Sequence, residues 1–344
     1  MPAKVAVLGA GSWGTTMAAL LSRRTPVVLW ARRAALADQI DRHHCNPDYL
    51  PDVALPAALR ATGSLEVALA GAEVVVMAVP SHGFRAILSE ALPHLAGGVP
   101  IVSLAKGVEE GTLQRMSEVV AELAPEHPRG VLTGPNLSSE VMAGHPTATV
   151  VAVTAGTGED QALAVELQRL FSTETLRVYT NPDIVGCELG GALKNVVAIA
   201  AGMADGMGFG DNTRAALVTR GLAELSRLGV ALGGDPLTFA GLAGMGDLVA
   251  TCISRHSRNR WVGEQLAKGR LIREVVTGTR MVAEGVRSSR AVVDLATSVG
   301  VEMPVAEQVA AVVHDGKSAA DVLATLMQRE MKAELMGPGT RVFQ

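Results

Sequence analysis

The sequence predicts an α/β protein in which a doubly wound, parallel sheet is followed by an all-helical part. The chain has 344 residues, enough for two domains of ordinary size. Short runs rich in Val, Ile and Leu alternate with helical stretches as far as Thr180. After Asn181 and Pro182 the strand signal ends, and long Ala, Leu and Gly segments follow at helical spacing. We therefore expect one domain over residues 1–182 and a second over residues 183–344.

The strands of the first domain are predicted from apolar runs that are continuous rather than alternating. Continuous hydrophobicity is typical of strands that are buried on both faces of a parallel sheet. The runs cover residues 4–8, 27–30, 73–79, 100–104, 130–133, 147–153 and 176–179. Helices are expected between several of them, at residues 13–23, 82–92, 112–123 and 160–170. In the second domain the helical segments are 184–204, 213–228, 258–266, 288–298, 305–313 and 319–328.

Composition and charge exclude several classes of protein. A hydrophobic share of 48% argues against intrinsic disorder. The formal net charge of −4 argues against a strongly basic nucleic-acid-binding domain. No run approaches the ~20 consecutive apolar residues of a membrane span. The three cysteines form no CxxC pair, so neither a zinc site nor a disulfide framework is predicted. This usage fits a reducing compartment, and the start of the chain leaves no room for a signal peptide, so we expect a cytoplasmic protein.

The first motif is a glycine-rich loop between the first strand and the first helix. Gly9, Gly11 and Gly14 form G-x-G-x-x-G, with Ser12 and Trp13 between the second and third glycines. The first glycine permits a tight turn, the second lets the backbone approach a pyrophosphate, and the third lets helix and strand pack closely. The helix N-terminus then directs its N–H groups at the phosphates. A glycine-rich turn without a ligand is the alternative, but the position after a strand favours a Rossmann-type dinucleotide-binding domain.

The end of the second predicted strand bears on the choice of cofactor. An acidic residue about 20 residues after the glycine loop would bind the ribose hydroxyls of NAD. Here Arg32 and Arg33 follow the strand, and the next acid is Asp38. Two arginines can hold a 2′-phosphate, so the sequence favours NADP over NAD. The alternative is a pair of solvated arginines at the start of the next helix.

Lysine is rare in this chain, and Lys194 stands in an unusual setting. It follows Gly190, Gly191 and Ala192 in an apolar segment and is itself followed by Asn195. Glycine in a helix indicates close approach of another backbone or of a ligand. Desolvation lowers the pKa of a lysine, which suits it to proton transfer near neutral pH. A lysine whose stem lies on the helix surface, with its ammonium group in solvent, is the alternative.

A further cluster of polar residues lies in the second domain. Asp247 sits in the turn Gly244-Met245-Gly246-Asp247, and Ser257, Arg258 and Asn259 follow ten residues later. A hydroxyl, a planar guanidinium and an amide in succession are suited to a phosphate group. The alternative is a loop and a helix cap, with Ser257 as the N-cap residue.

These motifs, taken together, resemble the bacterial type of NAD(P)-dependent glycerol-3-phosphate dehydrogenase over nearly the whole chain. The resemblance also includes Lys106-Gly107, Gly134-Pro135 and Glu284-Gly285. It implies reversible reduction of dihydroxyacetone phosphate to sn-glycerol 3-phosphate for phospholipid synthesis, NADP or NAD as cofactor, and a homodimer. It implies that Lys194 is the catalytic acid/base. The substrate residues that it implies are Lys106, Gly134, Asn136, Lys194, Asp247, Ser257, Arg258 and Asn259.

The resemblance also implies a set of cofactor residues. They are Gly9, Gly11, Ser12, Trp13, Gly14, Arg32, Arg33, Lys106, Ser138, Arg258, Val282 and Glu284. The segment Gly134–Glu140 departs from many members of this family, which carry Ala where Ser138 stands. We therefore expect Ser138 to contact the cofactor through its backbone and not through its side chain. No metal is implied.

The residues themselves support the same chemistry. A phosphate held by Arg258 and Asn259 would anchor a small ketone, and Lys194 would supply a proton or a positive charge where the carbonyl oxygen becomes negative. Asp247 would orient Lys194, and Lys106 follows a strand at the carboxyl edge of the sheet, where ligands bind in this fold. Two alternatives remain: a related 3-hydroxyacid or 6-phosphogluconate dehydrogenase, and a non-catalytic dinucleotide sensor.

Overall fold

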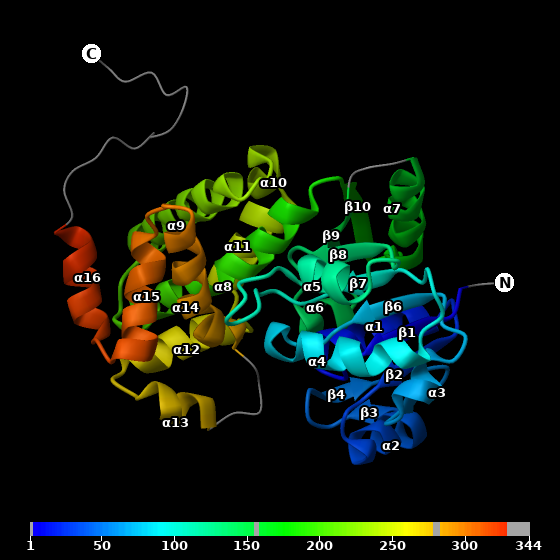
Figure 1. Ribbon diagram of the computed structural model, residues 1–344. Coiled ribbons are helices and arrows are strands. Elements are labelled where there is room, and N and C mark those ends of the chain that lie inside the picture. The colour runs from blue at the N-terminus through cyan, green and yellow to red at the C-terminus, as the bar shows by residue number, and fades with distance from the viewer. Residues whose placement is uncertain (1–2, 155–157, 278–282, 329–344) are drawn as a thin grey trace.

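The computed structural model describes residues 3–154, 158–277 and 283–328 (Figure 1). Its main sheet has eight strands in the order β10-β9-β8-β7-β6-β1-β2-β5. All neighbours are parallel except β8 and β9, which are antiparallel. The strands are β1 Val5–Leu8, β2 Val27–Trp30, β5 Arg60–Thr62, β6 Val74–Met77, β7 Ile101–Ser103, β8 Arg129–Thr133, β9 Thr147–Val153 and β10 Leu176–Asn181.

The antiparallel pairing of β8 with β9 corrects the prediction of a wholly parallel sheet. Only a five-residue helix, α6 Ser138–Met142, lies between β8 and β9. At 1.5 Å per residue it spans about 7.5 Å, too short to return along the length of a strand. The chain therefore enters β9 from the end at which it left β8. All seven predicted strands are otherwise present. Strand β5 and the small hairpin of β3 Cys45–Asn46 and β4 Leu50–Ala54 were not predicted.

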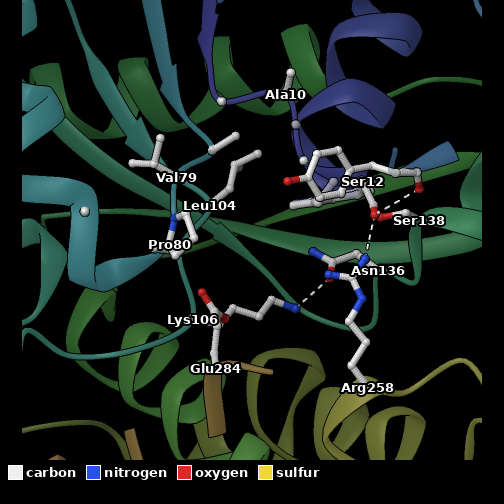
Figure 2. A pocket seen from close by; sticks show the side chains of 18 of the residues that line it. Ala10, Ser12, Val79, Pro80, Leu104, Lys106, Asn136, Ser138, Arg258 and Glu284 are labelled. Atoms are coloured by element: carbon white, nitrogen blue, oxygen red, sulfur yellow. Dashed lines mark hydrogen bonds between the residues drawn. The ribbon is translucent and has the colours of Figure 1, made fainter. Parts of the chain in front are cut away.

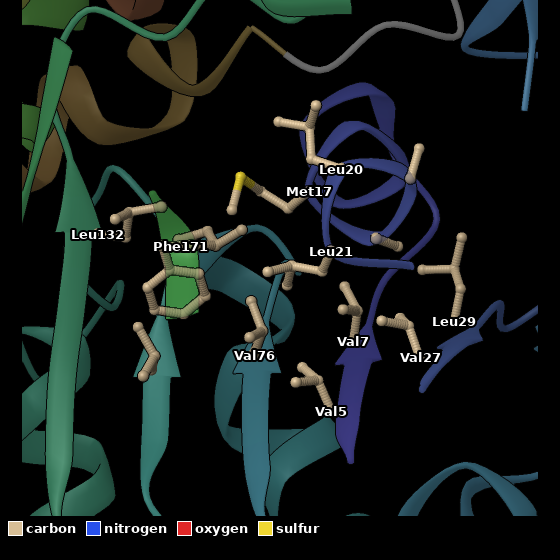
Figure 3. Packing of buried hydrophobic residues seen from close by; sticks show 14 of the residues in the cluster. Val5, Val7, Met17, Leu20, Leu21, Val27, Leu29, Val76, Leu132 and Phe171 are labelled. Carbon is tan, nitrogen blue, oxygen red and sulfur yellow. The ribbon is translucent and has the colours of Figure 1, made fainter. Parts of the chain in front are cut away.

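Helices cover both faces of the sheet and bury it. One face packs against α1 Ser12–Ser22, α2 Ala34–His43, α6 and α7 Gly158–Phe171, and the other against α3 Leu65–Leu69, α4 Ser81–Ala91 and α5 Met116–Leu123. The short helix η1 Leu92–His94 follows α4. Figure 3 shows Met17, Leu20 and Leu21 of α1 over the Val side chains of the central strands, beside Phe171. The buried strands thus hold the loop between β1 and α1 firmly at the carboxyl edge of the sheet.

Among the described residues of the second half, all regular elements are helices, as predicted. Its members are α8 Ile184–Gly206, α9 Asp211–Ala231, α10 Pro236–Ala240, the π-helical turn η2 Leu242–Gly246, α11 Asp247–Ile253, α12 Arg258–Ala267, α13 Ile272–Thr277, α14 Glu284–Ser298, α15 Pro304–Asp315 and α16 Ala319–Met327. The fold class is therefore confirmed. The boundary at residue 182 falls between β10 and α8 and stays a prediction as a domain limit.

Helix α8 is the central helix of this half. It has the length and hydropathy of a membrane span, but 94% of its most apolar window is buried inside the protein. Glycines let it pack closely against α12: a Cβ on Gly202 would lie 1.9 Å from the Arg260 carbonyl oxygen, and one on Gly263 would lie 2.1 Å from that of Ile199. The helix that carries Lys194 is therefore held on all sides by protein.

Candidate active site

A cleft of about 600 Å³ lies between the carboxyl edge of the sheet and the helical half. Figure 2 shows Ser12 and Ser138 from the sheet side facing Arg258 and Glu284 from the helical side, with Lys106 and Asn136 between them. The cleft therefore takes its walls from both halves of the chain. Predicted site residues that line it are Gly9, Gly11, Ser12, Trp13, Gly14, Arg32, Arg33, Lys106, Asn136, Ser138, Lys194, Ser257, Arg258, Asn259 and Glu284.

Two of the three motif glycines are required by the local geometry of the loop. Gly9 has φ +121, and a Cβ there would lie 2.5 Å from the carbonyl oxygen of Ala78. A Cβ on Gly14 would lie 2.0 Å from the Gly9 carbonyl oxygen, so helix α1 could not approach the strand. A Cβ on Gly11 would instead meet nothing within 4 Å. The loop is thus tight on the protein side and open on the side of the cleft.

Two buried donors in the cleft have no hydrogen-bond partner among the residues that the structure describes. They are the indole Nε1 of Trp13 and the amide Nδ2 of Asn136. Buried polar atoms are rarely left unsatisfied, so these two atoms fit a polar ligand. Together with the open backbone at Gly11 and the start of α1 at Ser12, they fit a dinucleotide in this cleft.

The two arginines after β2 have different surroundings. Arg33 forms an ion pair with Asp48, which comes from the turn between β3 and β4. The carboxylate raises the pKa of Arg33 and competes with any anion for its guanidinium. Arg32 lines the cleft and has no hydrogen bond or ion pair with the part of the chain that the structure describes. Asp48 was not predicted as an acid at this strand end, because only the β3–β4 hairpin brings it back there.

Two buried lysines meet on one carboxylate at the floor of the cleft. Asp247 is 2% exposed, and its Oδ2 accepts a hydrogen bond of 2.7 Å from Lys106 Nζ. Its Oδ1 accepts from Lys194 Nζ, which also donates to Thr251 Oγ1 at 2.8 Å. The predicted pairing of Asp247 with Lys194 is therefore present. Asp247 begins α11 directly after the π-helical turn, which points its side chain back at α8.

The environment of Lys194 moves its pKa well below the usual lysine range. Burial is the main cause, Asp247 opposes it, and the positive charge of Lys106 adds to the lowering. Lys106 itself also donates to the Gly134 carbonyl oxygen at 2.9 Å and to Asn136 Oδ1 at 2.6 Å. Gly134 and Asn136 are thus brought together with Lys106. Thr251 was missed, although its place four residues after Asp247 on one helix was visible in the sequence.

The remaining predicted residues surround this centre. Arg258 Nη2 donates to Ser12 Oγ at 2.6 Å, so the helical half reaches the glycine loop across the cleft (Figure 2). Ser257 caps α12, and its Oγ accepts from the Arg260 N–H at 3.3 Å. Asn259 donates to Asn195 Oδ1 at 2.8 Å and accepts from the Gly285 N–H at 3.0 Å.

These contacts bear on two of the predicted roles. The N-cap alternative for Ser257 is present, and the Asn259 amide donates one hydrogen to Asn195. At the start of α14, burial raises the pKa of Glu284 to about 7. Val282 lies outside the described residues.

Comparison with known proteins decides the family. The model of the N-terminal domain of NAD-dependent glycerol-3-phosphate dehydrogenase matches residues 4–158, and the model of its C-terminal domain matches residues 183–324. The chain belongs to the NAD-dependent glycerol-3-phosphate dehydrogenase family.

Curated relatives and a solved structure agree. The chain is 52% identical to glycerol-3-phosphate dehydrogenase (NAD(P)+) 2 of Sphingopyxis alaskensis, over 97% of this chain and 99% of that protein. It is 50% identical to the Streptomyces griseus glycerol-3-phosphate dehydrogenase (NAD(P)+), over 97% and 98%. The crystal structure of glycerol-3-phosphate dehydrogenase from Coxiella burnetii superposes with a TM-score of 0.91 at 35% identity, over 95% of this chain and 99% of that one. The protein is thus an oxidoreductase that uses NAD or NADP.

Proposed function

We propose that this glycerol-3-phosphate dehydrogenase reduces dihydroxyacetone phosphate reversibly to sn-glycerol 3-phosphate in the cleft between its two halves. The observation that carries the proposal is the pair of buried lysines that share Asp247 beside the open glycine loop. The bound nicotinamide cofactor supplies the hydride. Gly9, Gly11, Ser12, Trp13, Gly14, Arg32, Arg33, Ser138 and Glu284 hold the cofactor in this proposal.

Lys194 acts on the substrate oxygen. As the carbonyl carbon is reduced, negative charge grows on its oxygen, and the Lys194 ammonium donates a proton there. The lysine becomes a neutral amine and takes up a proton again from solvent. Asp247 fixes the direction of the ammonium group and favours its charged form. In the reverse direction the neutral amine accepts the proton of the alcohol.

The proposed substrate anchors are Lys106, Gly134, Asn136, Asp247, Ser257, Arg258 and Asn259. Arg258 offers a planar fork to the phosphate once it leaves Ser12. The Lys106 ammonium group binds both Asp247 Oδ2 and the Gly134 carbonyl oxygen, and it adds positive charge at this place.

A direct assay tests this function. Nicotinamide absorbance is followed with dihydroxyacetone phosphate, using NADH and NADPH separately, and with unphosphorylated dihydroxyacetone as the control. We expect turnover of the phosphate and poor turnover of the control. Absence of turnover with either cofactor, or preference for a 3-hydroxyacid or 6-phosphogluconate, would contradict the proposal, and cofactor binding without any turnover would favour the sensor.

Substitution of Arg258 tests the phosphate site. Arg258→Lys replaces a bidentate guanidinium by a point charge, so kcat/KM for dihydroxyacetone phosphate is expected to fall about 10- to 100-fold. The loss of kcat/KM for unphosphorylated dihydroxyacetone should be much smaller, because that substrate has no phosphate for Arg258 to bind. Steady-state kinetics with both substrates measures this. Equal losses would place Arg258 on the cofactor alone.

Substitution of the two arginines after β2 tests the cofactor site. We expect the wild type to use NADPH at least as well as NADH. Arg32→Ala/Arg33→Ala should weaken NADPH far more than NADH, roughly 10- to 100-fold, because each charge-assisted bond to a 2′-phosphate is worth ~1.5–3 kcal/mol. Arg32→Ala alone should carry most of this loss, since Arg33 already pairs with Asp48. Fluorescence titration gives both dissociation constants, and an equal loss for the two cofactors would exclude a 2′-phosphate site here.

We also propose a cytoplasmic homodimer that supplies glycerophospholipid synthesis. The resemblance of the motifs supports the dimer and the metabolic role. The three cysteines, Cys45, Cys187 and Cys252, are free thiols, which supports a reducing compartment. Light scattering on the purified protein tests the dimer.

A further inference from the structure

One face of helix α8 carries three residues that contact the same segment of the sheet half. They are Glu188, Gly191 and Asn195, spaced by three and four residues and therefore aligned along the helix. The segment is the connection from β7 to α5, residues 104–115, which we call the Lys106 loop. It begins beside the proposed active site and ends at the first turn of α5.

Glu188 holds the far end of the Lys106 loop. Its carboxylate accepts from Arg115 Nη1 at 2.9 Å and from the Ser117 backbone N–H at 2.9 Å, and the Ser117 hydroxyl donates to it as well. Glu188 is 8% exposed, and the side chain of Arg115 is 16% exposed. The carboxylate therefore binds both the last residue of the loop and an N–H group in the first turn of α5.

Asn195 holds the near end of the same loop. Its Nδ2 donates to the Lys106 carbonyl oxygen at 3.1 Å. Between the two anchors, Gly191 lets α8 approach the end of β8: a Cβ there would lie only 2.8 Å from Thr133 Oγ1, and at ordinary contact distance, 3.5 Å, from Lys106 Cγ of the loop. Glu188 and Asn195 are seven residues apart, about 10 Å along the helix, so the loop is fixed to α8 at two points.

Two apolar residues of the loop pack against the helical half, while residues 110–112 between them are exposed. Val108 is buried in the hydrophobic cluster of the helices, and Leu113 packs against it. Leu113 has φ +59, a conformation that leucine rarely adopts and that persists only where the surroundings enforce it. The loop is thus held by the helical half at Val108 and Leu113, by its own backbone hydrogen bond between Glu109 and Gln114, and by Arg85 of α4, which binds the side chains of both.

We propose that Glu188 is a positioning residue for the dehydrogenase reaction. It fixes the Lys106 loop on α8 so that the ammonium groups of Lys106 and Lys194 meet on Asp247. The inference rests on the roles of the two lysines in the proposed function. Lys194 belongs to α8 and Lys106 to the loop, so the docking of one on the other sets the distance between their charges.

The chemistry of the contact supports a role in orientation. Burial raises the pKa of Glu188, and the charge of Arg115 and the hydrogen bonds from Ser117 lower it. Burying a carboxylate is costly, and apolar residues would join two surfaces at less cost. A carboxylate instead fixes the relative orientation of the two surfaces, because three hydrogen-bond donors at the start of α5 must all point at its two oxygens.

The test compares the wild type with Glu188→Gln and Glu188→Ala, and uses Glu118→Gln as the matched control. Glu118 also binds Arg115, at 2.8 Å, but belongs to α5 itself and its side chain is 45% exposed. We expect kcat to fall about 10- to 100-fold in Glu188→Ala, since a misplacement of about 1 Å costs as much, and less in Glu188→Gln. The cofactor dissociation constant should stay within twofold, and Glu118→Gln should resemble the wild type.

The pH profile separates positioning from a structural role. Lys106 lowers the pKa of Lys194, so a displaced Lys106 lets that pKa rise. Lys194 then stays protonated to higher pH, and the falling limb of the reduction rate moves up in the Glu188 variants. Hydrogen exchange gives a readout besides activity: amides of residues 106–117 should exchange faster in Glu188→Ala and not in Glu118→Gln.

Three results would overturn the proposal. One is a Glu188→Ala enzyme with wild-type kcat. Another is a loss of kcat that follows the folded fraction alone, with an unmoved pH profile and unchanged exchange of residues 106–117. The third is an equal loss in Glu118→Gln. A wild type without turnover would contradict the proposed function, and this inference would fall with it, whereas an active wild type with unaffected variants would contradict the inference alone.

Discussion

Lys194→Ala is expected to lower kcat for dihydroxyacetone phosphate reduction by about 10²- to 10⁴-fold, the usual contribution of a general acid. The substitution removes the ammonium group that binds Asp247 and Thr251 and would protonate the substrate oxygen. The glycine loop and Arg32 are on the other side of the cleft, so the cofactor should bind as before. Initial rates and fluorescence titration of the cofactor measure the two effects.

Lys194→Met is the control for packing in the same position. Its side chain keeps most of the volume of a lysine in the buried site, so folding should be preserved while the proton donor is lost. Both variants should therefore show the same loss of kcat. A kcat near the wild-type value in either variant would exclude Lys194 as the acid.

Asp247→Asn is expected to lower kcat by about 10²-fold at neutral pH. Among the described residues, Asp247 is the one carboxylate that forms ion pairs with Lys106 and Lys194, and the substitution removes its charge. Asp247 raises the pKa of Lys194, so its removal lowers that pKa further and leaves less of the charged form to donate a proton. Reduction should then recover in part at lower pH. Two neighbouring ammonium groups without a counter-ion should also reduce the free energy of unfolding by about 3–5 kcal/mol.

Asp205→Asn is the matched control for this second variant. Asp205 is a largely buried carboxylate, with its side chain 9% exposed, and lies between Arg214 and Arg260 near the C-terminal end of α8. Its substitution should lower the melting temperature without a comparable loss of kcat. If Asp247→Asn and Asp205→Asn lose stability and activity in the same proportion, Asp247 has only a structural role.

Much of the fold was predictable because the strands and long helices have strong periodic patterns. Buried strands such as β6 are continuous in Val, and α8 is apolar over more than five turns. The missed elements are short or polar: α2 contains several charged residues, and β5 has only three residues at the sheet edge. The antiparallel β9 depends on the length of α6, which no periodic pattern reveals.

The residues of the site were predictable as motifs, but their mutual contacts were not. The lysine pair joins Lys106 to Asp247 across 141 residues, and no local signal states that one carboxylate serves both lysines. Likewise Asp48 reaches Arg33 only because the β3–β4 hairpin folds back. The role proposed for Glu188 depends on the contact of α8 with the Lys106 loop and with α5, which no local pattern of the sequence reveals.

The pH dependence of both directions of the reaction tests the central role of Lys194 most directly. Reduction requires the charged lysine and oxidation the neutral amine, so the rate of hydride transfer in single turnovers should fall with rising pH for reduction and rise for oxidation. Both limbs should share one midpoint, which lies below the ordinary lysine pKa of about 10.4 because burial lowers the pKa of Lys194. The account would be contradicted if the rates of reduction and oxidation changed in the same direction with pH. It would also be contradicted if both pH dependences were unchanged in Lys194→Met.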